Sequence, residues 1–198
     1  MNELEGIAEF LVEKKHAVAL TGAGISTPSG IPDFRSEDGL WSKYEPKVYA
    51  NYSIFLEEPE HYWNMARETT PLILHAKPNI IHNILAKMEE MGIIDAIITQ
   101  NVDFLHQKAG SKKIYELHGT YRTVTCLECA RQILRSEIEE FLKTDNGVPI
   151  CTDCGGILAP DVILFGQELD PEVMEQARRE VTQSNALIVI GSSLTVGN

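Results

Sequence analysis

Four cysteines, the complete set in this chain, form two Cys-x2-Cys pairs separated by 21 residues: Cys126, Cys129, Cys151 and Cys154. Each pair can form a tight turn that directs two thiolates at one ion, and two such turns complete the tetrahedron that Zn²⁺ prefers. Unrelated thiols or a redox pair are the alternatives, but the pattern uses every cysteine. Because four thiolates leave no position for water, we expect one structural zinc ion outside the chemistry.

A glycine-rich run, TGAGIS at residues 21–26, follows a short apolar segment. Such a turn lets backbone N–H groups approach a pyrophosphate, although a simple tight turn is the alternative because Gly30 comes too late for G-x-G-x-x-G. The run continues to Arg35 as a loop stiffened by prolines, PSGIPDFR. This loop is predicted to cover a ligand, unless Phe34 only packs a surface loop.

Polar residues follow three further apolar segments. Asn101 and Asp103 come after residues 96–99, His118 after 114–117, and Ser192 after 186–190. If these segments are parallel strands, their carboxyl ends meet at one edge, which is where ligands bind in open α/β sheets. A histidine placed there can act as a general base. The alternatives are that Asn101 and Asp103 cap the next helix and that His118 is structural.

The elements that would position these residues alternate along the chain. Helical periodicity is present at Leu4–Leu11 and at Ile81–Met88, where Gly92 is placed to end the helix, and Asp170–Pro171 is typical of a helix start. Between the helices lie four apolar segments expected to be buried strands: Ala17–Leu20, Ala96–Thr99, Ile114–Leu117 and Ala186–Ile190. The alternation predicts an α/β fold with a mostly parallel sheet, from which 28–77 and 122–158 leave as inserts.

The composition limits the class of protein. The chain has 198 residues, of which 43% are hydrophobic and 23% charged, and its formal net charge is −12. We therefore expect no stable binding to nucleic acid, and an affinity for cationic partners such as lysine-rich segments. The N-terminus is not typical of a signal peptide, and no apolar run is long enough to span a membrane, so we expect a cytoplasmic protein. We also expect a monomer.

Taken together, these motifs resemble those of the sirtuins, the family of NAD-dependent protein lysine deacylases. The resemblance extends from Ala17 to Val196 and is carried, in the family's order, by GAGIST-PSGIPDFRS, KPN-x-x-H, TQNVDFLHQKAG, LHG, both cysteine pairs and GSSLTV. It implies a Rossmann-like NAD-binding domain made of residues 1–27, 78–121 and 159–198. It also implies a smaller part, made of the cofactor-binding loop and helical insert (28–77) and the zinc-binding insert (122–158).

The resemblance also assigns roles to residues. His118 would be the general base, and Asn101 would assist it. The segment 162–166 would form a strand that pairs with an acetylated lysine peptide, through Val162, Ile163, Leu164, Phe165 and Gly166. NAD, a co-substrate that is consumed, would be bound by Gly22, Ala23, Gly24, Ile31, Asp33, Phe34, Arg35, Gln100, Asn101, Asp103, Gly191, Ser192 and Ser193. The expected products are free lysine, nicotinamide and O-acetyl-ADP-ribose.

Three departures from the family pattern bear on activity. Gln167 stands where the family has glutamate, which removes a negative charge beside the peptide. Trp63-Asn-Met-Ala66 lacks the arginine that pairs with acidic acyl groups, so an uncharged acyl group is expected. The chain stops at Asn198, before further strands of the family, and is expected to be a fragment or a shortened form. Mono-ADP-ribosyl transfer, or a non-catalytic zinc- and NAD-binding module, are the alternative functions.

Overall fold

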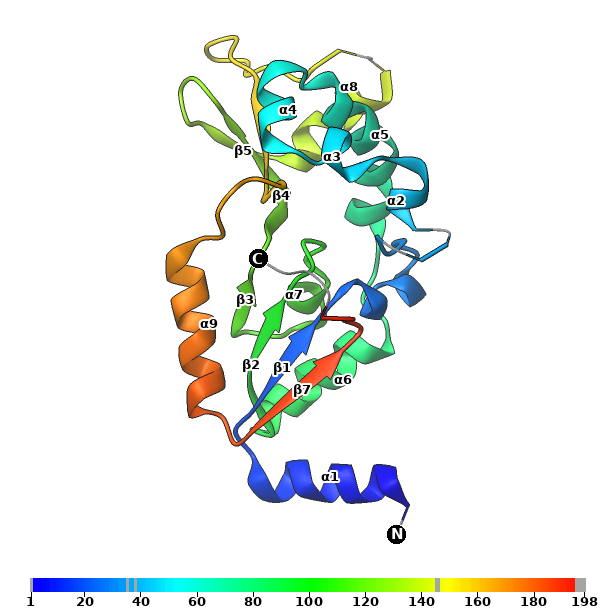
Figure 1. Ribbon diagram of the computed structural model, residues 1–198, viewed down its shortest axis with the longest axis vertical. Coiled ribbons are helices and arrows are strands. Elements are labelled where there is room, and N and C mark those ends of the chain that lie inside the picture. The colour runs from blue at the N-terminus through cyan, green and yellow to red at the C-terminus, as the bar shows by residue number, and fades with distance from the viewer. Residues whose placement is uncertain (1, 35, 38, 145–146, 195–198) are drawn as a thin grey trace.

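Four parallel strands form the sheet of the larger of two lobes in the computed structural model (Figure 1), which describes residues 2–34, 36–37, 39–144 and 147–194. Their order is β3-β2-β1-β7, with Val18 opposite Ala96 on one side and Leu187 on the other. All four predicted strands are confirmed, with small differences at the ends: β1 (Ala17–Thr21), β2 (Ile94–Thr99), β3 (Ile114–Glu116) and β7 (Ala186–Ile190).

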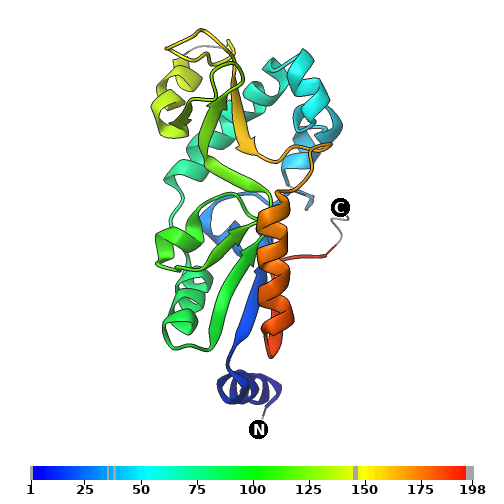
Figure 2. The same ribbon diagram turned by 90° about the vertical axis from the view of Figure 1, so that its left-hand side faces the viewer.

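Helices cover both faces of this sheet, as expected for parallel strands with little polar alternation. α6 (Ile80–Glu90) buries Leu85 against one face, and α9 (Pro171–Gln183) buries Ala177 against the other (Figures 1 and 2). α9 begins as predicted, because the Asp170 side chain accepts hydrogen bonds from the first free amides of the helix. α1 (Glu3–Lys14) lies across the amino-terminal end of the strands, and α7 (Leu105–Ala109) follows β2.

The strand order places a crevice at the carboxyl end of β1. From β1 the chain moves to β2 on one side, whereas β7 pairs with β1 on the other side. The loops that follow β1 and β7 therefore diverge from the sheet at a topological switch point, where open α/β sheets bind ligands. In Figure 1 the strand arrows point toward the smaller lobe, so the carboxyl ends of the strands face that lobe.

The smaller lobe combines an antiparallel sheet with helices. Its strands, in the order β5-β4-β6, are β4 (Gly119–Cys126), β5 (Gln132–Leu134) and β6 (Leu158–Val162). Its helices are α2 (Leu40–Lys43), α3 (Pro46–Tyr49), α4 (Tyr52–Glu57), α5 (Glu60–His75) and α8 (Glu139–Thr144), with a 3-10 turn at Arg135–Ile138. One buried cluster joins Tyr62 and Trp63 of α5 to Val124, Leu142 and Leu158. The two inserts therefore share a single core.

The predicted fold class is confirmed: a Rossmann-like parallel sheet with a smaller domain that contains the cysteines and the helical insert. β4 runs from the larger lobe into the smaller one and the antiparallel β6 runs back, so each crosses an insert boundary expected near residue 121 or 158. No helix in the described part of the chain is long and apolar enough to cross a membrane.

Candidate functional site

The loops after β1 and β7 approach each other so closely that only glycine fits between them. A Cβ on Gly22 would lie 2.6 Å from the Gly191 carbonyl oxygen, and one on Gly191 would lie 2.6 Å from the Ile25 nitrogen. The Gly22 and Gly24 amides donate to the carbonyls of Ile190 and Gly191, both at 3.0 Å. In this structure the glycines therefore join the two loops, and their own amides are already engaged. A phosphate contact through these two amides, as expected above, would need them to leave those carbonyls.

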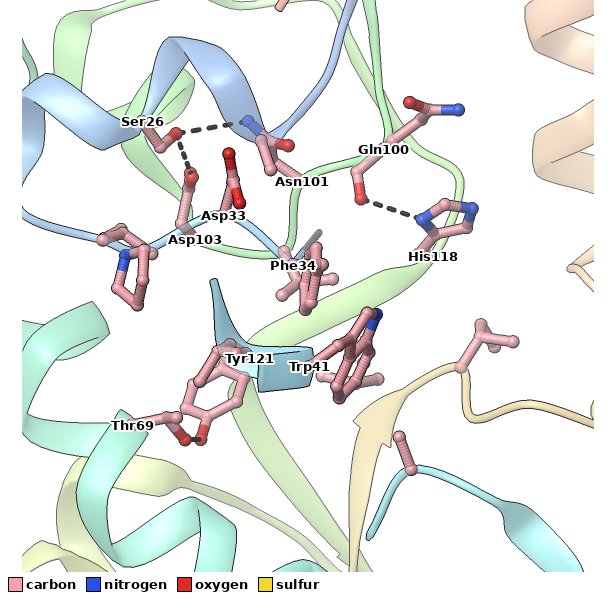
Figure 3. A pocket seen from close by; sticks show the side chains of 18 of the residues that line it. Ser26, Asp33, Phe34, Trp41, Thr69, Gln100, Asn101, Asp103, His118 and Tyr121 are labelled. Atoms are coloured by element: carbon pink, nitrogen blue, oxygen red, sulfur yellow. Dashed lines mark hydrogen bonds between the residues drawn. The ribbon is translucent and has the colours of Figure 1, made fainter. Parts of the chain in front are cut away.

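A buried polar network fixes the loop after β2. The Asn101 side-chain Nδ2 donates to the Gly22 carbonyl at 3.1 Å and contacts Ser26 Oγ at 3.2 Å. Ser26 Oγ donates to Asp103 Oδ2 at 2.6 Å, and the other Asp103 oxygen accepts the Leu105 amide at the start of α7 (Figure 3). Asn101 and Asp103 are 7% and 6% exposed. Asp103 thus binds the first amide of α7, whose N-cap residue is Phe104, and it also lines the cavity.

A second buried network links the carboxyl ends of β1 and β2 to α7. Thr21 Oγ1 donates to Thr99 Oγ1 at 2.9 Å and contacts Nε2 of His106 at 2.9 Å, while Thr99 Oγ1 accepts the Asn101 amide. The rings of His106 and His82 lie 5.1 Å apart between centroids, both almost fully buried. Burial lowers the pKa of both imidazoles, that of His106 to about 3, so both are neutral at pH 7.

His118 is the titratable group best placed for acid–base chemistry. Its Nδ1 lies 2.9 Å from the Gln100 carbonyl oxygen, which can only accept a hydrogen bond, so Nδ1 carries the proton and Nε2 holds a lone pair. No hydrogen bond involves Nε2 within the described residues. Burial lowers the pKa of His118, although the Gln100 carbonyl opposes this effect. The imidazole is therefore neutral at pH 7 and able to accept a proton.

The main chain at His118 packs closely against β6 because the next residue is a glycine. Gly119 has φ +73, and a Cβ there would lie 2.1 Å from the Asp161 carbonyl oxygen on β6. The Ile163 amide donates to the His118 carbonyl at 2.9 Å. Since β4 and β6 meet at this glycine, the histidine sits where the two lobes join.

Aromatic rings connect the loop after β1 to the segment after β6. The rings of Phe34 and Trp41 lie 5.1 Å apart between centroids, and those of Trp41 and Phe165 lie 6.2 Å apart. Phe34 and Trp41 project into the middle of the cavity in Figure 3. The segment 162–166 is not the continuous strand expected from the sequence. β6 ends at Val162, because Phe165 turns away to pair with the backbone around Asn51.

One cavity of about 500 Å³ is lined by many of these groups, among them Ser26, Phe34, Trp41, Asn101, Asp103, His118 and Phe165. Of the residues predicted from the sequence, Gly22 does not line it, and Arg35 lies outside the described residues. The cavity is lined by these predicted residues: Ala23, Gly24, Ile31, Asp33, Phe34, Gln100, Asn101, Asp103, His118, Val162, Ile163, Leu164, Phe165, Gly166, Gly191, Ser192 and Ser193. The Ser192 hydroxyl donates to the Gln100 side chain at 2.7 Å, which joins the ends of β2 and β7.

Several lining residues were not predicted. Ser26 and Tyr121 lie beside predicted residues in sequence, so the motifs could have suggested them. Four residues of α5 could have been grouped only by their helical spacing, which places them on one face of the helix: Tyr62, Met65, Thr69 and Ile73. The residues added by the structure include Ser26, Trp41, Tyr62, Met65, Thr69, Ile73, Val102 and Tyr121.

The four cysteines gather at the far end of the smaller lobe, away from this cavity. Their Sγ atoms all lie within 4.8 Å of one another, with Cys126 to Cys154 at 3.5 Å and Cys129 to Cys151 at 3.8 Å. Tetrahedral coordination with Zn–S bonds of about 2.3 Å requires sulfur atoms close to this far apart. The thiolates therefore fit one structural Zn²⁺, and none of them lines the cavity.

Fold and site together define a Rossmann-like enzyme with a zinc-bearing lobe and a ligand cavity between its two parts. The Sir2 family profile matches residues 22–198, and the chain belongs to this family. A Saccharolobus solfataricus NAD-dependent protein deacetylase is 45% identical over 192 residues, which is 97% of this chain and 76% of the relative. The Thermotoga maritima NAD-dependent protein deacetylase is 41% identical over 194 residues, 98% of this chain and 78% of the relative.

Solved structures agree with this assignment. A Sir2 enzyme with a deacetylated peptide and 3′-O-acetyl ADP-ribose superimposes with a TM-score of 0.93 at 40% identity, over 100% of this chain and 79% of the other. A Sir2 complex with a peptide and NAD⁺ gives a TM-score of 0.88 at 39% identity, over 98% of this chain and 78% of the other.

Proposed function

We propose that this chain is an NAD-dependent protein lysine deacetylase that consumes NAD and releases nicotinamide and O-acetyl-ADP-ribose. Its family membership and relatives named as NAD-dependent deacetylases support this function. The observation that carries the proposal is the state of His118. It is a neutral, half-buried imidazole with its Nδ1 proton held by Gln100 and its Nε2 lone pair available in the cavity.

We assign the polar edge of the cavity to the cofactor. Bound NAD supplies an electrophilic ribose carbon and a nicotinamide leaving group. Asn101 and Asp103 sit where they can hold the nicotinamide and the adjoining ribose, fixed by Ser26. Phe34, packed on Trp41, can shield the reacting carbon from water. Gln100 and Ser192, hydrogen-bonded to each other, would face the rest of the cofactor.

His118 would then take the proton from a ribose hydroxyl through Nε2. Once the acyl carbonyl oxygen has displaced nicotinamide from the ribose carbon, the deprotonated ribose oxygen would attack the acyl carbon. Addition of water would then release free lysine and leave the acetyl group on the ribose. Because Gln100 fixes the ring, no change of tautomer is needed before the transfer. The zinc site has no part in these steps and would stabilise the fold of the smaller lobe.

We assign the substrate peptide to the segment after β6, where Val162, Ile163, Leu164, Phe165 and Gly166 line the cavity. Sir2 structures that hold acetylated or propionylated peptides support a peptide substrate.

We also propose that residues 1–27, 78–121 and 159–198 form the NAD-binding domain, with 28–77 and 122–158 as inserts. Four unpaired cysteines are typical of a reducing compartment, so we propose that the protein is cytoplasmic. We also propose that it is a monomer.

Substitution of His118 tests the proposal. The His118→Ala variant is expected to bind NAD normally in calorimetry and to lose roughly 10²–10⁴-fold in deacetylation rate, because its general base is missing. His16→Ala is a suitable control, since His16 is exposed at the opposite end of β1 and pairs with Asp95. Unchanged deacetylation in His118→Ala would refute the assignment of the base.

A further inference from the structure

The wall of the cavity opposite the sheet edge is built by α5 and β4. Tyr62, Met65, Thr69 and Ile73 come from successive turns of α5, and Tyr121 comes from β4. Thr69 and Tyr121 lie across the cavity from Asn101 and His118 in Figure 3. The Tyr121 hydroxyl is satisfied within the wall, at 2.7 Å from Thr69 Oγ1. This wall therefore presents mainly ring and alkyl carbon to the cavity.

A buried cation lies behind the wall. Arg135, at the start of the 3-10 turn in the zinc-binding insert, is 0% exposed. Its guanidinium carbon lies 3.8 Å from the centroid of the Tyr121 ring and 5.8 Å from that of Tyr62. Its Nη2 donates to the Tyr62 hydroxyl at 2.9 Å. One side chain thus contacts both tyrosines of the wall.

The environment of Arg135 is unusual for a structural arginine. No carboxylate forms an ion pair with it in the described part of the chain, and its Nε and Nη1 have no hydrogen-bond partner there. Burying a charge without such partners is costly, and an apolar side chain of similar volume would fill the space at lower cost. The planar guanidinium can, however, stack on one ring and donate to the other, which fixes the orientation of both.

We propose that Arg135 is a positioning residue that holds Tyr62 and Tyr121 in place and thereby limits the size of the acyl group the enzyme accepts. This inference rests on the proposed deacetylase function. The acyl carbonyl must react near His118, and the peptide occupies the side of residues 162–166. The alkyl end of the acyl group is then directed toward the wall formed by these rings. A rigid wall favours short chains such as acetyl.

The Arg135→Met variant tests this role with peptides that carry acetyl, propionyl, butyryl and hexanoyl lysine. Methionine fills the space but neither stacks as a cation nor binds the Tyr62 hydroxyl. We expect the ratio of kcat/KM for butyryl over acetyl to rise about tenfold, since one methylene in a pocket is worth at least that much. The change should appear in the KM of the longer substrates, with the KM for NAD unchanged.

Lys143→Met is the matched control, because Lys143 is a cation of the same insert whose half-exposed side chain pairs with Glu139. It should leave the ratio unchanged. Tyr62→Phe removes only the hydroxyl that Arg135 binds, so it should raise the butyryl-to-acetyl ratio by less than Arg135→Met does. If Arg135→Met fails to fold, the result for Tyr62→Phe tests the inference. An unchanged ratio in folded variants would overturn the inference. Failure of the wild-type chain to deacetylate the acetyl peptide would instead overturn the proposed function.

Discussion

At His118, one backbone hydrogen bond sets both the tautomer and the direction of the ring. The Gln100 carbonyl at the end of β2 binds Nδ1, and Gly119, where a Cβ would collide with the Asp161 carbonyl, lets the main chain beside the ring pack closely on β6. The motif LHG predicted a histidine at a strand end, and its structural environment explains why this histidine is neutral at pH 7. A base that is already deprotonated needs no prior proton loss to act.

The pH dependence of turnover follows from this state. Burial holds the pKa of His118 below its usual value of 6.5, so the reactive neutral form predominates at pH 6.5 and above. Lowering the pH through the pKa protonates Nε2, and kcat/KM should fall on the acid side. We expect the acid limb of a kcat/KM profile to lie below pH 6.5. A midpoint above pH 7 would contradict the burial of a neutral base.

Some residue roles could not be predicted from the sequence. His118, Asn101 and Asp103 follow strands, so their place at one edge could be inferred from topology alone. Arg135 gave no such signal, because its role depends on contacts with Tyr62, which is 73 positions away. For Gly22 and Gly24, the sequence predicted close approach of the backbone, but not that the approaching group is the loop after β7.

At the scale of elements, the strands and main helices could be predicted because each has its own pattern of apolar residues in the sequence. The joining of the two inserts could not. It depends on packing between α5 and the zinc-binding insert, which no local pattern reveals. The zinc pattern, by contrast, was complete in the sequence, since two Cys-x2-Cys pairs predict one four-thiolate site, and the four Sγ atoms do lie within 4.8 Å of one another.

Loss of one zinc ligand should therefore act on the smaller lobe as a whole. Cys129→Ala is expected to lose zinc and to reduce deacetylation by more than about 10-fold. Removing a residue that only hydrogen-bonds to a metal ligand already lowers metal affinity or activity by about that factor. The cause would be unfolding around β4 and β5, which belong to the lobe that forms the wall of the cavity. Zinc content and thermal unfolding measure it, with exposed Lys143→Met as control. A variant that kept its zinc and its melting temperature would contradict the structural role.

At the scale of the whole molecule, three buried or half-buried histidines link stability to pH. His82, His106 and His118 all have lowered pKa values, with burial as the main cause, and that of His106 is about 3. In the unfolded chain each titrates near 6.5, so below this pH the unfolded state binds more protons than the folded state. Stability should therefore be fully present above pH 6.5 and fall as the pH decreases.

This dependence can be measured by urea unfolding between pH 7.5 and 5.5. Between pH 6.5 and its own pKa in the folded state, each such histidine removes at most about 1.4 kcal/mol of unfolding free energy per pH unit, and His106 does so over the whole acid part of this range. His106→Gln, which can still donate to Thr21, should reduce the slope by about one histidine's share. A wild-type free energy that is constant over this range, or that rises on acidification, would contradict the neutral buried state of these side chains.

One cavity is lined both by the residues assigned to NAD and by those assigned to the peptide, so acetyl removal should depend on NAD. The most direct test incubates the full chain with NAD and an acetyl-lysine peptide and measures nicotinamide and deacetylated peptide over time. The proposed function predicts that the two products form in equal amounts, and that neither forms when NAD is absent or the peptide is unmodified. Deacetylation without NAD, or nicotinamide release without deacetylated peptide, would contradict it.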